Sequence, residues 1–95
     1  MNKNRAIILD AIQAFGKEHQ LFVAVEELSE LQKELCKSLR GCGNIWHIAE
    51  EVADVEIMLE QLKEIYMLHD LCDNYMAMKL ERLERRTKAK RGELT

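Results

Sequence analysis

Apolar residues recur at steps of three and four positions along almost the whole chain, which is the period of an α-helix. Sustained alternation of apolar and polar residues, the pattern of a strand, is not found anywhere. The clearest break in the helical pattern is "GCGN", residues 41–44, and weaker breaks fall at Gly16 and around Leu68 to Asp70. The pattern therefore predicts an all-α chain of four helices.

The first helix is expected from about Asn4 to Phe15 and the second from about Glu18 to Leu39. The third should start near Ile45 with Asn44 as its N-cap, and the fourth should follow the break near Leu68. Short connections between long helices favour antiparallel neighbours, so we expect an antiparallel four-helix bundle-like fold with the second and third helices side by side. The positions expected to face the core are Ile8, Ala11, Ile12 and Phe15 in the first helix, Leu21, Ala24, Val25, Leu28, Leu31 and Leu35 in the second, and Ile48, Val52, Val55, Leu59 and Leu62 in the third.

The length of 95 residues suits one domain, residues 1–95, with a basic tail over 87–95 that we expect to fray. A domain this short buries only about 60 to 65% of the surface that its unfolded chain exposes, so the core of one protomer is marginal. Apolar faces left over would favour association into a homo-oligomer, with dimer and tetramer both open. The composition, 47% hydrophobic and 33% charged with no proline, suits helices.

The cysteines and the lengths of the apolar runs indicate in which cellular compartment the protein is expected. Cys36, Cys42 and Cys72 are odd in number and form no CxxC motif, so a disulfide framework is not expected and a cytoplasmic location fits best. No apolar run approaches the roughly 20 residues that a membrane span requires. We also expect no signal peptide, because Asp10 and Gln13 interrupt the apolar stretch near the start.

Charge is unevenly distributed along the chain, which has a formal net charge of -3. No lysine or arginine occurs from Gly41 to Leu62. The same segment carries the acids Glu50, Glu51, Asp54, Glu56 and Glu60, and the basic residues gather in the tail as Lys79, Arg82, Arg85, Arg86, Lys88, Lys90 and Arg91. One part of the molecule therefore offers carboxylates and another offers cations.

Two pairs of acids stand out because their own helices do not neutralise them. Glu27 with Glu30, and Glu51 with Asp54, are each three residues apart and so are neighbours on a helix surface. The residues four positions after Glu27, Glu51 and Asp54 are apolar. The pairs are either solvated acids at the edge of a core, or they converge on a hard divalent cation, for which oxygen ligands favour Mg²⁺ or Mn²⁺ over Zn²⁺.

At these residues the chain resembles a known family. "EELSE", with Glu26, Glu27 and Glu30, followed about twenty residues later by "EVAD", with Glu51 and Asp54, is similar to the EExxE and ExxD signature of the MazG-like, all-α nucleoside triphosphate pyrophosphohydrolases. The similarity extends to "FGKEHQ", to "HIAEEVADVEIML" and to "KLERLERR". It implies a MazG-type fold and an enzyme that cleaves between the α and β phosphates of a (d)NTP.

The resemblance also implies roles for individual residues. Glu27, Glu30, Glu51 and Asp54 would ligate Mg²⁺, with Mn²⁺ as a substitute, and Glu26 and Glu50 would support them or orient the attacking water. Lys79 and Arg82 match basic positions of the family's last helix and would contact the outgoing pyrophosphate. The family often has a basic residue or asparagine just beyond, where this chain has Leu83.

Further substrate contacts are open to two interpretations. Lys33 and Lys37 lie one and two turns beyond Glu30 and would either contact phosphate or remain solvated helix-surface lysines. Gln20, Trp46 and His47 lie near the expected mouth of the site and would hold a base by stacking and edge contacts. For Trp46 the alternative is packing against the core at the start of its helix.

Three other functions compete with this hypothesis. A zinc site would draw on the three cysteines with His47 and His69, although no pair shows the spacing of a zinc finger or ribbon. The basic tail would allow a nucleic-acid-associated adaptor, although Glu81 and Glu84 are interleaved with its basic residues. A relative that keeps the fold and binds nucleotides without turnover is the third.

Overall fold

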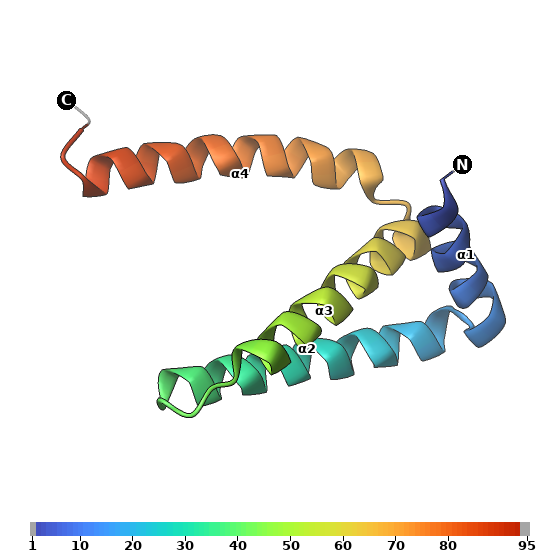
Figure 1. The fold of residues 1–95 in the computed structure, drawn as a ribbon. Helices are drawn as coiled ribbons and strands as arrows, with labels where there is room; N and C mark the ends of the chain where they lie inside the picture. Colours follow the sequence, from blue (N-terminus) through green and yellow to red (C-terminus); the bar gives the residue numbers. More distant parts are fainter. Residues whose placement is uncertain (1, 94–95) are drawn as a thin grey trace.

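The computed structural model describes residues 2–93, and within them the chain is helical with no strand. The four helices are α1 (Lys3–Phe15), α2 (Lys17–Leu39), α3 (Ile45–Tyr66) and α4 (His69–Lys90) (Figure 1). The expected helices are confirmed to within a few residues at each end. None of these helices is both long and apolar enough to cross a bilayer.

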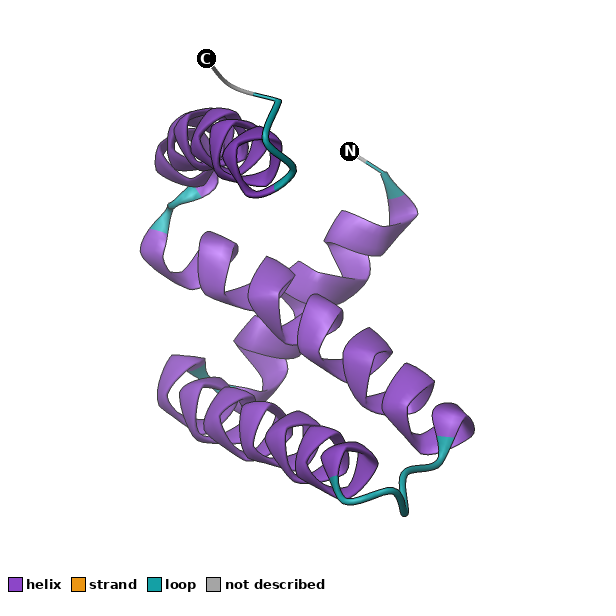
Figure 2. Cartoon of the chain, turned by 90° about the vertical axis from the view of Figure 1, so that its left-hand side faces the viewer, coloured by secondary structure: helices purple, strands orange, loops and turns teal. Residues whose placement is uncertain are grey.

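Helices α2 and α3 form an antiparallel hairpin with the most extensive interhelix contact in the chain (Figure 1). They are closest near the loop that joins them and diverge toward the other end. There α1 lies across both, as the turned view also shows (Figure 2). The expectation that the second and third helices are antiparallel neighbours is therefore confirmed.

Local sequence explains the ends of this hairpin. The Asn44 side chain accepts hydrogen bonds from the backbone N–H groups of Trp46, at 2.9 Å, and His47, at 3.3 Å, which makes it the N-cap of α3 as expected. In the loop, a Cβ added at Gly43 would lie 2.7 Å from the Ser38 Cα. Only glycine permits the backbone to pass that close to the end of α2.

The core of the described residues is small and partly polar. Its buried apolar side chains are Ala24, Val55 and Met58. Beside them Gln20 and Gln61 are 5% and 4% exposed, and the Gln20 amide donates a 2.7 Å hydrogen bond to Gln61 Oε1. This bond satisfies two polar groups that would otherwise be costly to bury between α2 and α3.

Six positions expected in the core are instead exposed, because no other helix among residues 2–93 covers the sides of the helices on which they lie. These positions are Phe15, Val25, Leu28, Leu35, Val52 and Leu59.

Helix α4 does not join the other three in a bundle. It leaves the end of α3 and projects away, contacts only α3 among the helices, and buries none of its residues (Figures 1 and 2). Thus the single chain packs three helices rather than the expected four. The helix continues to Lys90, and ion pairs one turn apart, Arg85 with Glu81 and Lys88 with Glu84, support its end. Residues 94–95 of the tail that was expected to fray lie outside the described residues.

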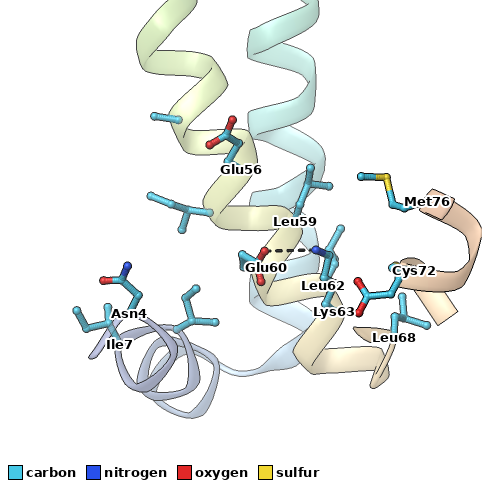
Figure 3. A pocket seen from close by; sticks show the side chains of 14 residues that line it. Asn4, Ile7, Glu56, Leu59, Glu60, Leu62, Lys63, Leu68, Cys72 and Met76 are labelled. Atoms are coloured by element: carbon cyan, nitrogen blue, oxygen red, sulfur yellow. Dashed lines mark hydrogen bonds and ion pairs between the residues drawn. The ribbon is translucent and has the colours of Figure 1, made fainter. Parts of the chain in front are cut away.

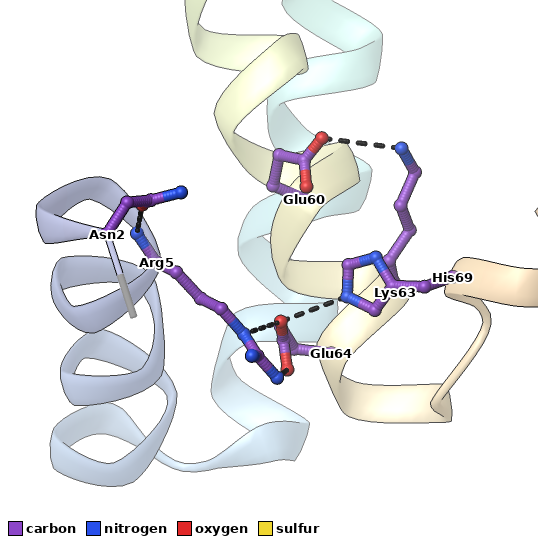
Figure 4. A network of polar contacts seen from close by, with 6 residues as sticks. All are labelled: Asn2, Arg5, Glu60, Lys63, Glu64 and His69. Carbon is purple, nitrogen blue, oxygen red and sulfur yellow. Dashed lines mark hydrogen bonds and ion pairs between the residues drawn. The ribbon is translucent and has the colours of Figure 1, made fainter.

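A polar junction holds the starts of α1 and α4 to the end of α3. Glu64 accepts a 2.8 Å hydrogen bond from Arg5 Nε of α1 and lies 2.9 Å from His69 Nε2 of α4 (Figure 4). The hydrogen bond from Arg5, and then that from His69, lower the pKa of Glu64. Because the Glu64 side chain is only 11% exposed, this carboxylate is better shielded than a surface ion pair.

Candidate metal centre

The antiparallel pairing of α2 with α3 brings acids from both helices to one place. Glu27 of α2 and Glu51 and Asp54 of α3 each present a carboxylate oxygen such that all three lie within 4.8 Å of one another. All three residues are half-buried. The prediction that acids of the second and third helices converge is therefore confirmed for three of the four proposed ligands.

Burial and mutual repulsion act together on these carboxylates. Burial raises the pKa of Glu27, and the negative charges of Asp54 and Glu51 raise it further. Burial likewise raises the pKa of Glu51, followed by the charges of Asp54 and Glu30. Two acids with raised pKa values next to a third have a surplus of negative charge that a bound cation would relieve.

Glu30, the fourth proposed ligand, lies at the edge of this cluster. Its charge contributes to the raised pKa of both Glu27 and Glu51, so it is close to both. Its side chain is exposed, however, and its oxygens are not among the three that lie within 4.8 Å of one another. Glu30 is therefore a neighbour of the three converging carboxylates, and its role as a ligand stays a prediction.

Glu34 is an acid of this region that sequence reasoning missed. It is 8% exposed, and its charge adds to the raised pKa of Glu51. One oxygen receives a weak 3.4 Å ion pair from Lys37, and the other, Oε2, is buried without a hydrogen-bond partner. The spacing of Glu27, Glu30 and Glu34, at steps of three and four, is the signal that would have placed all three on one face of α2.

The donor set fits a hard cation. Only carboxylate oxygens converge, and the buried Oε2 of Glu51, like that of Glu34, has no hydrogen-bond partner. Among the described ion pairs, the only basic group on any of these acids is Lys37 on Glu34. Glu27, Glu51 and Asp54 are the residues that would hold Mg²⁺ or Mn²⁺.

The donor set argues against zinc. No histidine or cysteine between residues 2 and 93 belongs to a cluster of three or more ligating side chains, and the three cysteines are free thiols. Thiolate and imidazole ligands, which favour zinc, are therefore not gathered in that part of the chain.

The other acidic and basic candidates lie around this centre. Glu26 and Glu50 are exposed, and the charge of Glu50 contributes to the raised pKa of Glu51. Lys33 is exposed on α2. Lys37 pairs with Glu34, so it is a neighbour of the acids rather than a free surface lysine.

Lys79 and Arg82 are not brought to the acids within one chain. Both are exposed on α4, which contacts α3 but not α2, and neither has an acidic partner among the described ion pairs. The projecting course of α4 is the reason for this separation (Figure 1). For these cations to contact a nucleotide bound at the acids, α4 would have to come from another copy of the chain or follow a different course.

The three candidates for base recognition have different surroundings. Gln20 is in the core, where its amide is bonded to Gln61 and its Oε1 lies 2.8 Å from His19 Nδ1, so it does not line a mouth. Trp46 is 79% exposed and therefore does not pack against the core of this chain. His47 is also exposed beside it, so these two side chains are free to meet a ligand.

A scan against protein-family models finds no match, and searches of curated proteins and of solved structures find no similar protein either. The resemblance at the two acidic motifs and the geometry of the acids therefore carry the functional argument.

Proposed function

We propose that this protein is a Mg²⁺-dependent nucleoside triphosphate pyrophosphohydrolase of the MazG-like type, which converts a (d)NTP to the monophosphate and pyrophosphate. The observation that carries the proposal is the gathering of Glu27, Glu51 and Asp54 from two helices. Two short motifs that resemble the same family supply the three residues. The free thiols of all three cysteines are in keeping with a cytoplasmic setting for this activity.

The acids would act by binding and positioning. Glu27, Glu51 and Asp54 hold the cation, which when bound neutralises phosphate charge and polarises a water for attack on phosphorus. Glu30, at the edge of the cluster, orients that water or accepts its proton. Glu26 and Glu50 are exposed near the ligands and remain the alternative bases.

Substrate would enter from the exposed side of the acids. A triphosphate is anionic, as the site is, so the two meet only through a cation and nearby basic groups. Lys33 and Lys37 of α2 are the basic candidates within the chain. Trp46, exposed at the start of α3, offers a ring on which a base can stack.

Product analysis tests the proposal. The protein is incubated with a panel of ribo- and deoxyribonucleoside triphosphates in the presence of Mg²⁺ or of EDTA, and the products are separated by anion exchange. Monophosphate with pyrophosphate, formed only with the metal, is the expected result. Diphosphate with orthophosphate would contradict the assignment of the bond.

A second measurement covers the case of no turnover. Binding of a triphosphate, followed by calorimetry, would then indicate a protein that binds nucleotides without cleaving them. The absence of both turnover and binding would favour an adaptor in which the acids have no catalytic role.

A further inference from the structure

The chain exposes far more surface than a compact protein of its mass. A folded monomer of 11.1 kDa should expose about 5,700 Å², whereas this chain exposes 7843 Å². Its radius of gyration is 17.0 Å, against about 12.4 Å for a compact domain of this length. The excess of roughly 2,100 Å² is larger than the 800 Å² or so that each partner contributes to a typical stable interface.

The excess surface is apolar where α4 leaves the rest of the fold. Helix α4 exposes a series of large apolar side chains: Leu71, Tyr75, Met76, Met78, Leu80 and Leu83. Between α1 and the first turns of α4 lies a groove of about 1010 Å³ (Figure 3), and its lining includes Ile7 and Ile8 of α1, Ile57 and Leu62 of α3, and Met76 of α4. Because both α4 and the groove are exposed, α4 of one copy can pack into the groove of a second copy and bury the apolar side chains of both.

Charge complementarity points to α4 as the element that fills the groove. Between Lys79 and Lys90, α4 carries six basic and two acidic residues. The groove is bordered by Glu56, Glu60 and Asp73, and Lys63, its one basic lining residue, is paired with Glu60 at 3.3 Å. An α4 from another copy would thus bring apolar side chains to an apolar groove and positive charge to its acidic border.

We propose that two copies of this chain form a symmetric dimer in which the α4 helix of each lies in the α1–α3–α4 groove of the other. A two-fold axis makes the two contacts identical, so each α4 occupies one groove and neither groove is left exposed. The groove lies on the far side of α3 from the metal centre, because Glu60 follows Glu51 by nine residues, half a turn around the helix. The dimer does not depend on the proposed activity.

The first experiment measures the dissociation constant of the dimer by sedimentation velocity over a concentration series. Wild type is expected to dimerise. Leu83→Glu places a charge on the helix and Ile57→Glu places one in the groove. Each should raise the dissociation constant at least about 100-fold, since a two-fold interface contains each change twice. The matched control is Gln32→Glu, exposed on α2, a helix that contributes no residue to the groove, and it should leave the dissociation constant within threefold. Far-UV circular dichroism should be unchanged by Leu83→Glu, because α4 buries nothing within the chain.

The second experiment identifies the occupant of the groove. A photoreactive residue at position 83 should cross-link to groove residues of the other copy, which isotope-mixed dimers distinguish by mass spectrometry. A wild type that stays monomeric would overturn the proposal, as would a dimer that tolerates both Leu83→Glu and Ile57→Glu, or cross-links confined to one copy. Mg²⁺ binding, read separately on the same proteins, reports on the metal centre and not on this interface.

Discussion

Replacing Asp54 by asparagine removes one charge from the metal centre at nearly constant shape. Asp54 is the strongest charged neighbour of both Glu27 and Glu51, and it raises the pKa of each. Since groups with raised pKa values favour folding when protonated and oppose it when ionised, the charge on these glutamates opposes folding at pH 7. Asp54→Asn should therefore raise the melting temperature of the metal-free protein while it weakens cation binding.

The size of the cation effect follows from linkage. At a Mg²⁺ concentration ten times its dissociation constant, a ligand that binds only the folded state stabilises it by about 1.4 kcal/mol. For a domain of this length that corresponds to a rise of about 6 to 11 °C in melting temperature. In Asp54→Asn the rise at the same Mg²⁺ concentration should fall below about 2 °C, because one of the three converging ligands has lost its charge.

The assay is thermal unfolding followed by circular dichroism at one protein concentration, with EDTA or with Mg²⁺. Asp10→Asn is the matched control, since Asp10 is an exposed aspartate on α1 and makes no ion pair among the described residues. It should leave both melting temperatures within about 2 °C of the wild-type values. Equal stabilisation of wild type and Asp54→Asn by Mg²⁺, or a metal-free variant that melts well below wild type, would contradict a shared cation site at these acids.

Three further outcomes are expected. Gln61→Ala leaves the buried Gln20 amide without its partner and should cost about 1 to 3 kcal/mol in the free energy of unfolding, measured with urea; a loss below half a kilocalorie would mean that water replaces the bond. Glu34→Gln should weaken Mg²⁺ binding by about tenfold in calorimetry, since Glu34 acts on Glu51 from beside the cluster, and an unchanged affinity would remove Glu34 from the site. Mg²⁺ affinity should fall as pH is lowered from 7 toward about 5, because the raised pKa values of Glu27 and Glu51 let protons compete with the cation there. Without metal, in EDTA, these two groups should contribute to the free energy of unfolding at low pH, and this contribution should be lost as pH rises through their raised pKa values.

The helices were predictable because local signals agreed with one another. The three and four residue period, the glycines at 16, 41 and 43 and the Asn44 cap all mark boundaries that the structure keeps. The break before α4 was less sharply predicted, because no glycine or proline marks it. There the helix ends as Met67 adopts a left-handed conformation at φ 56°, which the sequence does not signal.

Packing was predictable only where both partners lie on neighbouring segments. The convergence of Glu27 with Glu51 and Asp54 follows from an antiparallel hairpin, so motif spacing was sufficient. The direction of α4 depends on which helices pack against it. The helical spacing of its apolar residues fits a bundle within one chain and a bundle between two chains equally well. Gln20 was misplaced for a similar reason, since a polar residue on an apolar face is read as a surface group unless its partner, Gln61, is known.

Paramagnetic broadening by Mn²⁺ shows whether Glu27, Glu51 and Asp54 bind one cation together. Amide signals of the ¹⁵N-labelled protein are recorded as Mn²⁺ is added at concentrations below that of the protein. Signals around residues 27, 51 and 54 should disappear first and together, and Asp54→Asn should remove this selectivity. Broadening centred elsewhere, or spread evenly over all exposed acids, would contradict the idea that these carboxylates share one cation.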